Sequence, residues 1–111
     1  MKRVEAIIAP EKISAVNDAL KKAGVSGVIA WDGKGRGAGR REATYVRGYY
    51  VPQFHSRTSI MTVVDDSKVD EVVNAILSAA SMGSRGDGKI FISTVEDAVD
   101  IGSKKKGASA I

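Results

Sequence analysis

The chain has 111 residues, no cysteine and a single histidine, His55. Without cysteine it can form neither a disulfide framework nor a thiolate metal site, and one histidine makes no zinc site. No apolar run approaches the about 20 residues of a membrane-spanning helix. The N-terminus lacks an apolar segment followed by a cleavage site, so we expect a cytoplasmic protein without a metal centre.

Aromatic residues are also scarce, at 5%, whereas 43% of the residues are hydrophobic. The core must therefore be built mainly from Val, Ile, Ala and Leu. The length fits one domain covering residues 1–111. A domain of this size buries only about 65% of its unfolded surface, which makes association between subunits an expected further source of burial.

The formal net charge is +4, and the positive charge is concentrated in two segments. The stretch 33–57 holds six Lys or Arg against one Glu, and lysines occupy 104–106. This distribution favours an anionic ligand or partner. Tyrosines interleaved with arginines between 45 and 57 are also a mixture that binds nucleic acid. We treat that reading as a minor alternative and expect no nucleic-acid partner.

Hydrophobic periodicity predicts a β-α-β-β-α-β order. Alternating or apolar runs predict strands over 2–9, 25–31, 59–64 and 89–95, and apolar spacings of three and four predict helices over 10–23 and 65–80. Residues 98–101 are expected to add a short strand. This order is typical of an α+β, ferredoxin-like fold with two helices on one face of an antiparallel four-stranded sheet. The uncovered sheet face favours a homo-oligomer in which sheets face one another.

The helix ends carry their own signals. Pro10 suits the first turn of a helix, and Gly24 stands where a helix-terminating glycine belongs. Asp65, Asp66 and Ser67 offer an N-cap with acidic residues in the first turn.

The stretch 33–57 separates two predicted strands and shows neither helical nor strand periodicity. Its first seven residues contain four of the twelve glycines. A connection of about 25 residues far exceeds the usual 2–6 in a compact domain, so it indicates either a wrong strand assignment or a functional loop. Our working hypothesis is that the scaffold presents this loop.

Two glycine-rich motifs suggest phosphate binding. GKGRGAGR at 33–40 would let backbone N–H groups approach a phosphate, but Arg40 replaces the last glycine of a dinucleotide fingerprint and no helix follows. GSRGDGK at 83–89 has the spacing of a P-loop, but Ile90 replaces the magnesium-binding Ser or Thr and the segment leads from helix to strand. A flexible basic hinge and an ordinary turn remain the alternatives.

Residues for catalysis are few. Ser56 and Ser59 lie near His55 in sequence, but this proximity makes no triad. The acidic residues show no paired-carboxylate pattern, and His55 is expected to be an exposed loop residue. We predict that the protein is not an enzyme and has no catalytic residues.

Several segments together resemble the PII signal-transduction proteins of nitrogen regulation. They are MKRVEAIIAPEKISAVNDAL at the start, KGRG at 34–37, YVRGYY at 45–50, SRGDGKIF at 84–91 and the closing ASAI. The resemblance covers the whole chain. It implies a homotrimer of ferredoxin-like subunits with a long T-loop at about 35–57, a B-loop at about 82–89 and a C-terminal tail at about 98–111.

The resemblance also implies a function. Adenine nucleotides (ATP or ADP) bind as effector ligands in clefts between subunits, with no obligatory cofactor. The T-loop contacts a partner, such as an ammonium transporter or an enzyme or regulator of nitrogen metabolism, and the membrane is involved only through a transporter. The residues that match nucleotide-cleft positions are Gly35, Gly37, Val63, Gly86, Asp87, Gly88 and Lys89. Lys89 is the expected phosphate contact.

The T-loop supplies the expected partner-binding residues, which are Arg40, Arg41, Arg47, Tyr49 and Tyr50. Arg47, near the loop's tip, is the expected anchor, because its guanidinium is a bidentate donor. Tyr50 lies nearest the tyrosine that some bacterial members have uridylylated, and Tyr49 is the alternative.

The chain departs from the family at four positions. Ala38 and Gly39 replace an arginine and the glutamine that binds magnesium and 2-oxoglutarate, and Asp100 and Gly102 replace phosphate-binding arginines. The resemblance therefore does not carry over a 2-oxoglutarate response with magnesium, and it leaves ADP and AMP open beside ATP. Other cations could substitute: Arg36, Arg40, Arg41, Arg57 or the lysines at 104–106. The alternative function is a divergent sensor of AMP or ADP and another small anion such as bicarbonate.

Overall fold

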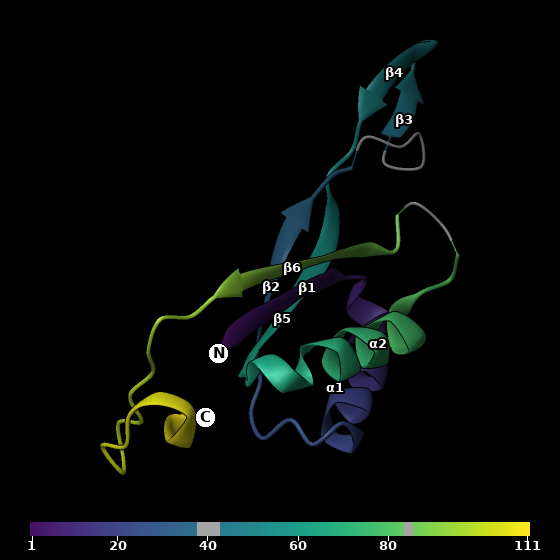
Figure 1. The fold of residues 1–111 in the computed structure, drawn as a ribbon. Coiled ribbons are helices and arrows are strands. Elements are labelled where there is room, and N and C mark those ends of the chain that lie inside the picture. The colour runs from purple at the N-terminus through teal and green to yellow at the C-terminus, as the bar shows by residue number, and fades with distance from the viewer. Residues whose placement is uncertain (38–42, 84–85) are drawn as a thin grey trace.

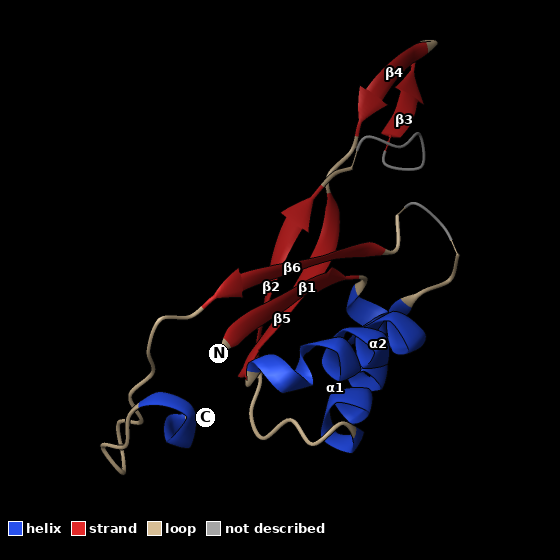
Figure 2. Cartoon of the chain, viewed as in Figure 1, coloured by secondary structure: helices blue, strands red, loops and turns tan. Residues whose placement is uncertain are grey.

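The computed structural model describes residues 1–37, 43–83 and 86–111. Four strands form one antiparallel sheet in the order β2-β5-β1-β6, and β3 and β4 form a separate hairpin. Both helices cover one face of the sheet, while the hairpin projects far from it (Figures 1 and 2). The ferredoxin-like architecture is therefore confirmed. The elements are β1 (Lys2–Ile8), α1 (Ile13–Lys22), β2 (Ile29–Gly35), β3 (Ala43–Val46), β4 (Tyr49–Pro52), β5 (His55–Val64), α2 (Val69–Ala80) and β6 (Gly88–Thr94).

The core lies between the helices and the sheet. Alternate residues of β1 point into it because successive strand side chains face opposite sides, and the helices contribute apolar stripes at spacings of three and four. A fully buried aliphatic side chain contributes about 1.5–3 kcal/mol, so this layer is a major source of stability. Its buried residues include Val4, Ala6, Ile8, Val16, Leu20, Ile60, Val72 and Ile76.

A tight 3₁₀ turn precedes each helix: Pro10–Lys12 before α1 and Asp66–Lys68 before α2. Asp65 caps the second turn, as expected, because its carboxylate accepts hydrogen bonds from the Ser67 backbone N–H at 3.1 Å and the Ser67 hydroxyl at 2.7 Å. These bonds, led by that from the hydroxyl, favour the charged carboxylate and lower the pKa of Asp65. None of the helices in the described ranges is long and apolar enough to cross a membrane.

The second strand lies four residues later than predicted. The sequence favoured 25–31, but β2 is Ile29–Gly35. Gly24 has a φ of 84° and ends α1, and the next backbone N–H, of Val25, bonds back to the Leu20 carbonyl at 3.0 Å. The Val25 side chain then packs against the core, so its apolar character reflects a helix-terminating turn rather than a strand.

The shift of β2 also corrects the prediction for the long loop. Gly33 pairs with Arg57 and Gly35 with His55, so both ends of the predicted loop belong to the sheet. The connection between the sheet strands is 36–54, and it contains the β3–β4 hairpin. The prediction that 33–57 holds no strand was wrong, because cross-strand pairing with β5 compensates for the missing side-chain pattern of the glycines.

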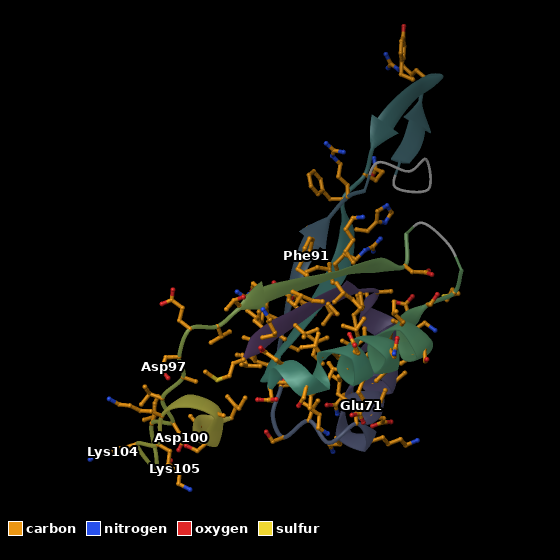
Figure 3. The ribbon with its side chains drawn as sticks, in the orientation of Figure 1. Glu71, Phe91, Asp97, Asp100, Lys104 and Lys105 are labelled. Carbon is orange, nitrogen blue, oxygen red and sulfur yellow. The ribbon has the colours of Figure 1, made fainter. Side chains whose placement is uncertain are left out.

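The C-terminal segment was predicted to add a strand at 98–101. The structure shows only an isolated bridge between Val99 and Lys106, around a turn in which the Ser103 backbone N–H donates to Asp100 Oδ2 at 2.8 Å. Hydrogen bonds from the hydroxyl and backbone of Ser103 lower the pKa of Asp100. The two sides pair too briefly to form a ladder. Figure 3 shows Asp100 and Lys104 in this segment, away from the sheet.

Candidate functional site

A cleft of about 230 Å³ lies where the end of β2, the start of β5 and the 86–89 turn meet. It brings together five of the seven residues predicted to bind nucleotide, which come from two segments about fifty residues apart in the sequence. The lining residues are Ile7, Gly35, Arg36, Gly37, Arg57, Gly86, Gly88, Lys89 and Phe91.

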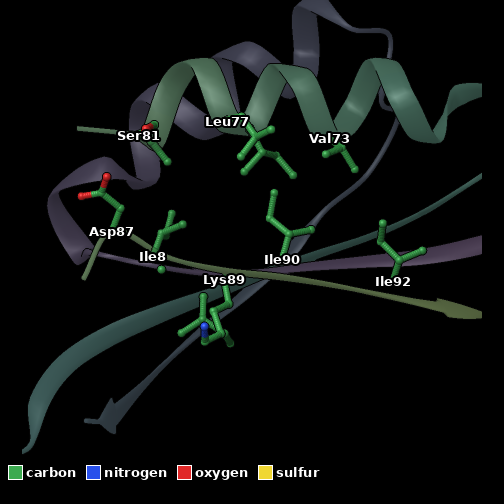
Figure 4. A pocket seen from close by; sticks show the side chains of 12 residues that line it. Ile8, Val73, Leu77, Ser81, Asp87, Lys89, Ile90 and Ile92 are labelled. Atoms are coloured by element: carbon green, nitrogen blue, oxygen red, sulfur yellow. The ribbon is translucent and has the colours of Figure 1, made fainter. Parts of the chain in front are cut away.

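Strand register explains this convergence. Ile7 lies at the centre of the sheet, opposite Lys89 on β6 and opposite Ser59 on β5. Residues that oppose each other in a sheet share a face, so Ile7 and Lys89 point to the side away from the helices. Figure 4 shows Lys89 on that side, whereas Ile90 points toward α2. Phe91 follows Lys89 by two positions and therefore shares its face (Figure 3).

The cleft is strongly cationic. Arg36, Arg57 and Lys89 line it, and none of its described lining residues is acidic. Arg57 also donates from Nη1 to the Ser56 carbonyl at 2.9 Å, which restrains its side chain along β5. Guanidinium and ammonium groups form charge-assisted hydrogen bonds with phosphate. Beside them Ile7 and Phe91 offer an apolar surface, so the arrangement fits a ligand with an anionic group and a flat or apolar part.

Asp87 has a different position from its glycine neighbours. Its Oδ2 accepts a hydrogen bond from the Met82 backbone N–H at 2.7 Å, which closes the turn between α2 and β6. It lines a neighbouring groove of about 380 Å³ that Val73 and Leu77 of α2 border, rather than the cationic cleft (Figure 4). In this chain Asp87 therefore shapes the turn that carries the cleft glycines.

Val63 also lies apart from the cleft within one chain. It borders a pocket of about 220 Å³ together with Gly24 and the C-terminal residues Ala108 and Ile111. A role for Val63 in nucleotide binding therefore needs a second subunit to bring it to the cleft. That role stays a prediction.

The structure describes three of the five predicted partner-binding residues, Arg47, Tyr49 and Tyr50. Arg47 and Gly48 form the tip of the β3–β4 hairpin with φ values of 51° and 82°, the pair of left-handed residues typical of a type I′ turn. Arg47 is exposed, and Tyr49 is 75% exposed. Tyr50 lies in β4 opposite Tyr45. Arg40, Arg41, Ala38 and Gly39 lie outside the described residues.

The apolar half of the cleft does not follow from the sequence motifs. The sequence places Ile7 only in the first predicted strand, and Phe91 only in the fourth and in the SRGDGKIF motif. The signal that could have identified them is the two-residue alternation of strands, which places Phe91 on the face of Lys89. Across the described ranges, no group of three or more His, Cys, Asp or Glu side chains is placed to hold a metal ion.

Similarity to known proteins identifies the family of this chain. A family model described as nitrogen regulatory protein P-II matches residues 1–105. Curated relatives named nitrogen regulatory protein P-II include those of Azospirillum brasilense at 40% identity, Nostoc punctiforme at 41% and Synechocystis sp. at 42%. Each alignment covers 112 residues and the full length of both chains. The chain therefore belongs to the nitrogen regulatory protein P-II family.

Proposed function

We propose that this chain is a non-enzymatic, cytoplasmic signal-transduction protein that binds adenine nucleotides and regulates nitrogen metabolism or ammonium transport. Membership of the P-II family supports the regulatory role. The proposal of an adenine-nucleotide ligand rests on the cationic cleft. This cleft combines Arg36, Arg57 and Lys89 with backbone-exposing glycines and the aromatic ring of Phe91. Phosphates suit the cations, and a purine suits the apolar surface.

The cleft of one chain is only part of the proposed site. Its volume of about 230 Å³ is below the roughly 300–1,000 Å³ typical of small-molecule pockets. A second subunit that covers the cleft would enlarge it and could contribute Val63 and the lysines at 104–106. The proposed assembly is a homotrimer with nucleotide sites between subunits.

The proposed signal passes from the cleft to the hairpin. Gly35 and Arg57 line the cleft and lie on the two strands from which 36–54 extends. A bound nucleotide that contacts both strands would favour one hairpin orientation over another, and its effect equals its difference in affinity for the two states. Arg47 and Tyr49, exposed at the tip, are then the proposed partner contacts, for an ammonium transporter or a nitrogen-metabolism enzyme or regulator.

Lys89→Ala tests the ligand assignment. A charge-assisted hydrogen bond is worth about 1.5–3 kcal/mol, so the variant should bind ATP and ADP about 10–150-fold more weakly by calorimetric titration, with the oligomer intact. Lys12→Ala, which removes a lysine from the 3₁₀ turn before α1, is the control. Equal affinities of the two variants would contradict the assignment of Lys89.

A second candidate keeps the cleft but changes the co-ligand. Ala38 and Gly39 stand where the family has an arginine and a magnesium- and 2-oxoglutarate-binding glutamine, which favours a sensor of AMP or ADP with another small anion. Titrations of 2-oxoglutarate with ATP and magnesium, compared with bicarbonate and ADP, distinguish the two. Synergy in the first pair supports a nitrogen sensor with a 2-oxoglutarate response, and synergy in the second supports the alternative.

A further inference from the structure

The sheet face opposite the helices, here the open face, carries large apolar side chains around a small polar cluster. Ile29 is 56% exposed, Trp31 43% and Phe91 54%. Residues paired across strands share a face, and Met61 pairs with both Ile29 and Glu5 while Glu5 also pairs with Phe91. One row of the open face therefore runs across all four strands, with a carboxylate between apolar residues.

The polar cluster consists of Arg3, Glu5 and Ser59 on the two central strands. Arg3 Nη2 donates to Glu5 Oε1 at 3.1 Å, and Ser59 Oγ donates to Glu5 Oε2 at 2.7 Å. The Glu5 side chain is only 20% exposed, and Ser59 is buried. One carboxylate thus fixes a donor from each of two neighbouring strands in the middle of the face.

The cluster has hydrogen-bonding capacity left over. Arg3 Nε has no hydrogen-bond partner among the described residues but is inaccessible to solvent, so a further partner must approach the rest of the side chain, which is 42% exposed. A guanidinium has five N–H donors and a carboxylate about four acceptor sites, so both groups can bond further. Covering the face without partners for them would leave polar groups unsatisfied, which is costly.

The unused groups are complementary to one another. Arg3 offers donors and Glu5 offers acceptors, so a rotated copy of the same face supplies what each lacks. A different protein would need its own matching pair at the same spacing. The apolar residues around the cluster would be covered in the same contact.

We propose that the Arg3–Glu5–Ser59 cluster sets the orientation in which copies of this chain pack through their open faces. Apolar burial drives association but is not directional, so the apolar residues alone would allow several arrangements. A polar group inside an apolar interface allows only the subunit arrangements in which its hydrogen bonds are formed, at some cost in stability. This inference rests on the proposed homotrimer.

The test replaces the cluster by apolar residues in the combined variant Arg3→Met, Glu5→Met, Ser59→Ala. Native mass spectrometry measures the stoichiometry. Because the chain has no cysteine, Ser78→Cys on α2, outside the open face, provides one spin-label site for distances between subunits. The wild-type background should give one stoichiometry and one narrow distance peak. The cluster variant should still associate, with mixed stoichiometries and a distance distribution at least twice as broad.

Glu71→Met is the matched control, because it removes a carboxylate outside the open face. Glu71 lies on α2 and pairs with Lys68 of the preceding 3₁₀ turn at 3.7 Å. It should leave both readouts unchanged. Ser59→Ala alone keeps the Arg3–Glu5 pair and should broaden the distance peak less; it serves if the combined variant fails to fold.

A single stoichiometry and an unchanged narrow peak in the cluster variant, or in Ser59→Ala where only that variant folds, would overturn the proposal. A monomeric cluster variant would also overturn it, because the cluster would then supply affinity rather than orientation. A monomeric wild type would refute the proposed homotrimer as well. A trimeric wild type with an unaffected cluster variant would refute this inference alone.

Discussion

Gly88 is a position where a single added methyl group should damage the protein severely. It is the first residue of β6, pairs with Ile8 of β1 and has a φ of 130°, which side-chain-bearing residues rarely adopt. A Cβ built there would overlap the Ile7 carbonyl oxygen and lie 3.0 Å from the Ile7 carbonyl carbon. These are backbone atoms of the central strand, so no side-chain rotation can relieve the overlap.

The magnitude for Gly88→Ala has two sources. An unfavourable backbone conformation costs about 1–3 kcal/mol, and displacing packed atoms adds about 1–3 kcal/mol. We therefore expect the free energy of unfolding to fall by about 2–6 kcal/mol. Since small domains are stable by only about 5–15 kcal/mol, the loss should be plain in urea unfolding at fixed protein concentration.

Substitutions at two other glycines separate the cost of the backbone conformation from the cost of displacing packed atoms. Gly83 has a φ of 76° but nothing within 4 Å of an added Cβ, so Gly83→Ala should show only the backbone cost. Gly33 in β2 has neither a positive φ nor a close neighbour, so Gly33→Ala should change stability little or raise it slightly. If Gly88→Ala were no less stable than Gly83→Ala, the inferred approach of β6 to β1 would be wrong.

Three further predictions concern the core and the caps. Leu20→Ala, at a buried site, should lower the free energy of unfolding by about 2–5 kcal/mol, whereas half-exposed Leu77→Ala should cost clearly less in the same urea experiment. Thr62→Val removes the hydrogen bond from Thr62 Oγ1 to the Gly27 carbonyl at 2.7 Å and should cost about 0.5–1.5 kcal/mol by the same measurement, because Gly27 is exposed and water can replace the lost donor. For Asp65 the folded pKa lies below the unfolded one, so its stabilising effect is present above the unfolded pKa and disappears as the pH falls through the folded pKa. The melting temperature of the wild type should therefore exceed that of Asp65→Ala near neutral pH, and the difference should shrink on acidification; a constant difference would contradict the cap.

The sequence predicted best where one element shows its own pattern. α2 carries apolar residues at helical spacing, and the 3₁₀ turn that leads into it is capped by Asp65. β2 was misplaced because its second half, Gly33–Lys34–Gly35, has no side-chain alternation to reveal a strand. Its pairing with β5 is non-local, and no local pattern encodes such a partner.

In the candidate site, too, the residues with a local motif could be predicted and those placed by the fold could not. The glycines and Lys89 were found through motifs, which mark residue types at fixed spacing, and the fold brings five of them into one cleft. Motifs could not show that the Asp87 carboxylate turns back to the Met82 N–H, because that depends on how the turn folds. Nor could they reveal Ile7, whose place in the cleft follows from its register opposite Lys89.

The cleft lies where the long connection between β2 and β5 joins the sheet. Residues 36–54 leave from Gly35 and return at His55, which pair with each other as the last pair of the β2–β5 ladder. Arg36 and Arg57, which lie close to that last pair in the sequence, both line the cleft. An anion that bridges the two arginines would tie both strands together. The relative position of β2 and β5, at the point where residues 36–54 begin and end, would then depend on the geometry of that bridge.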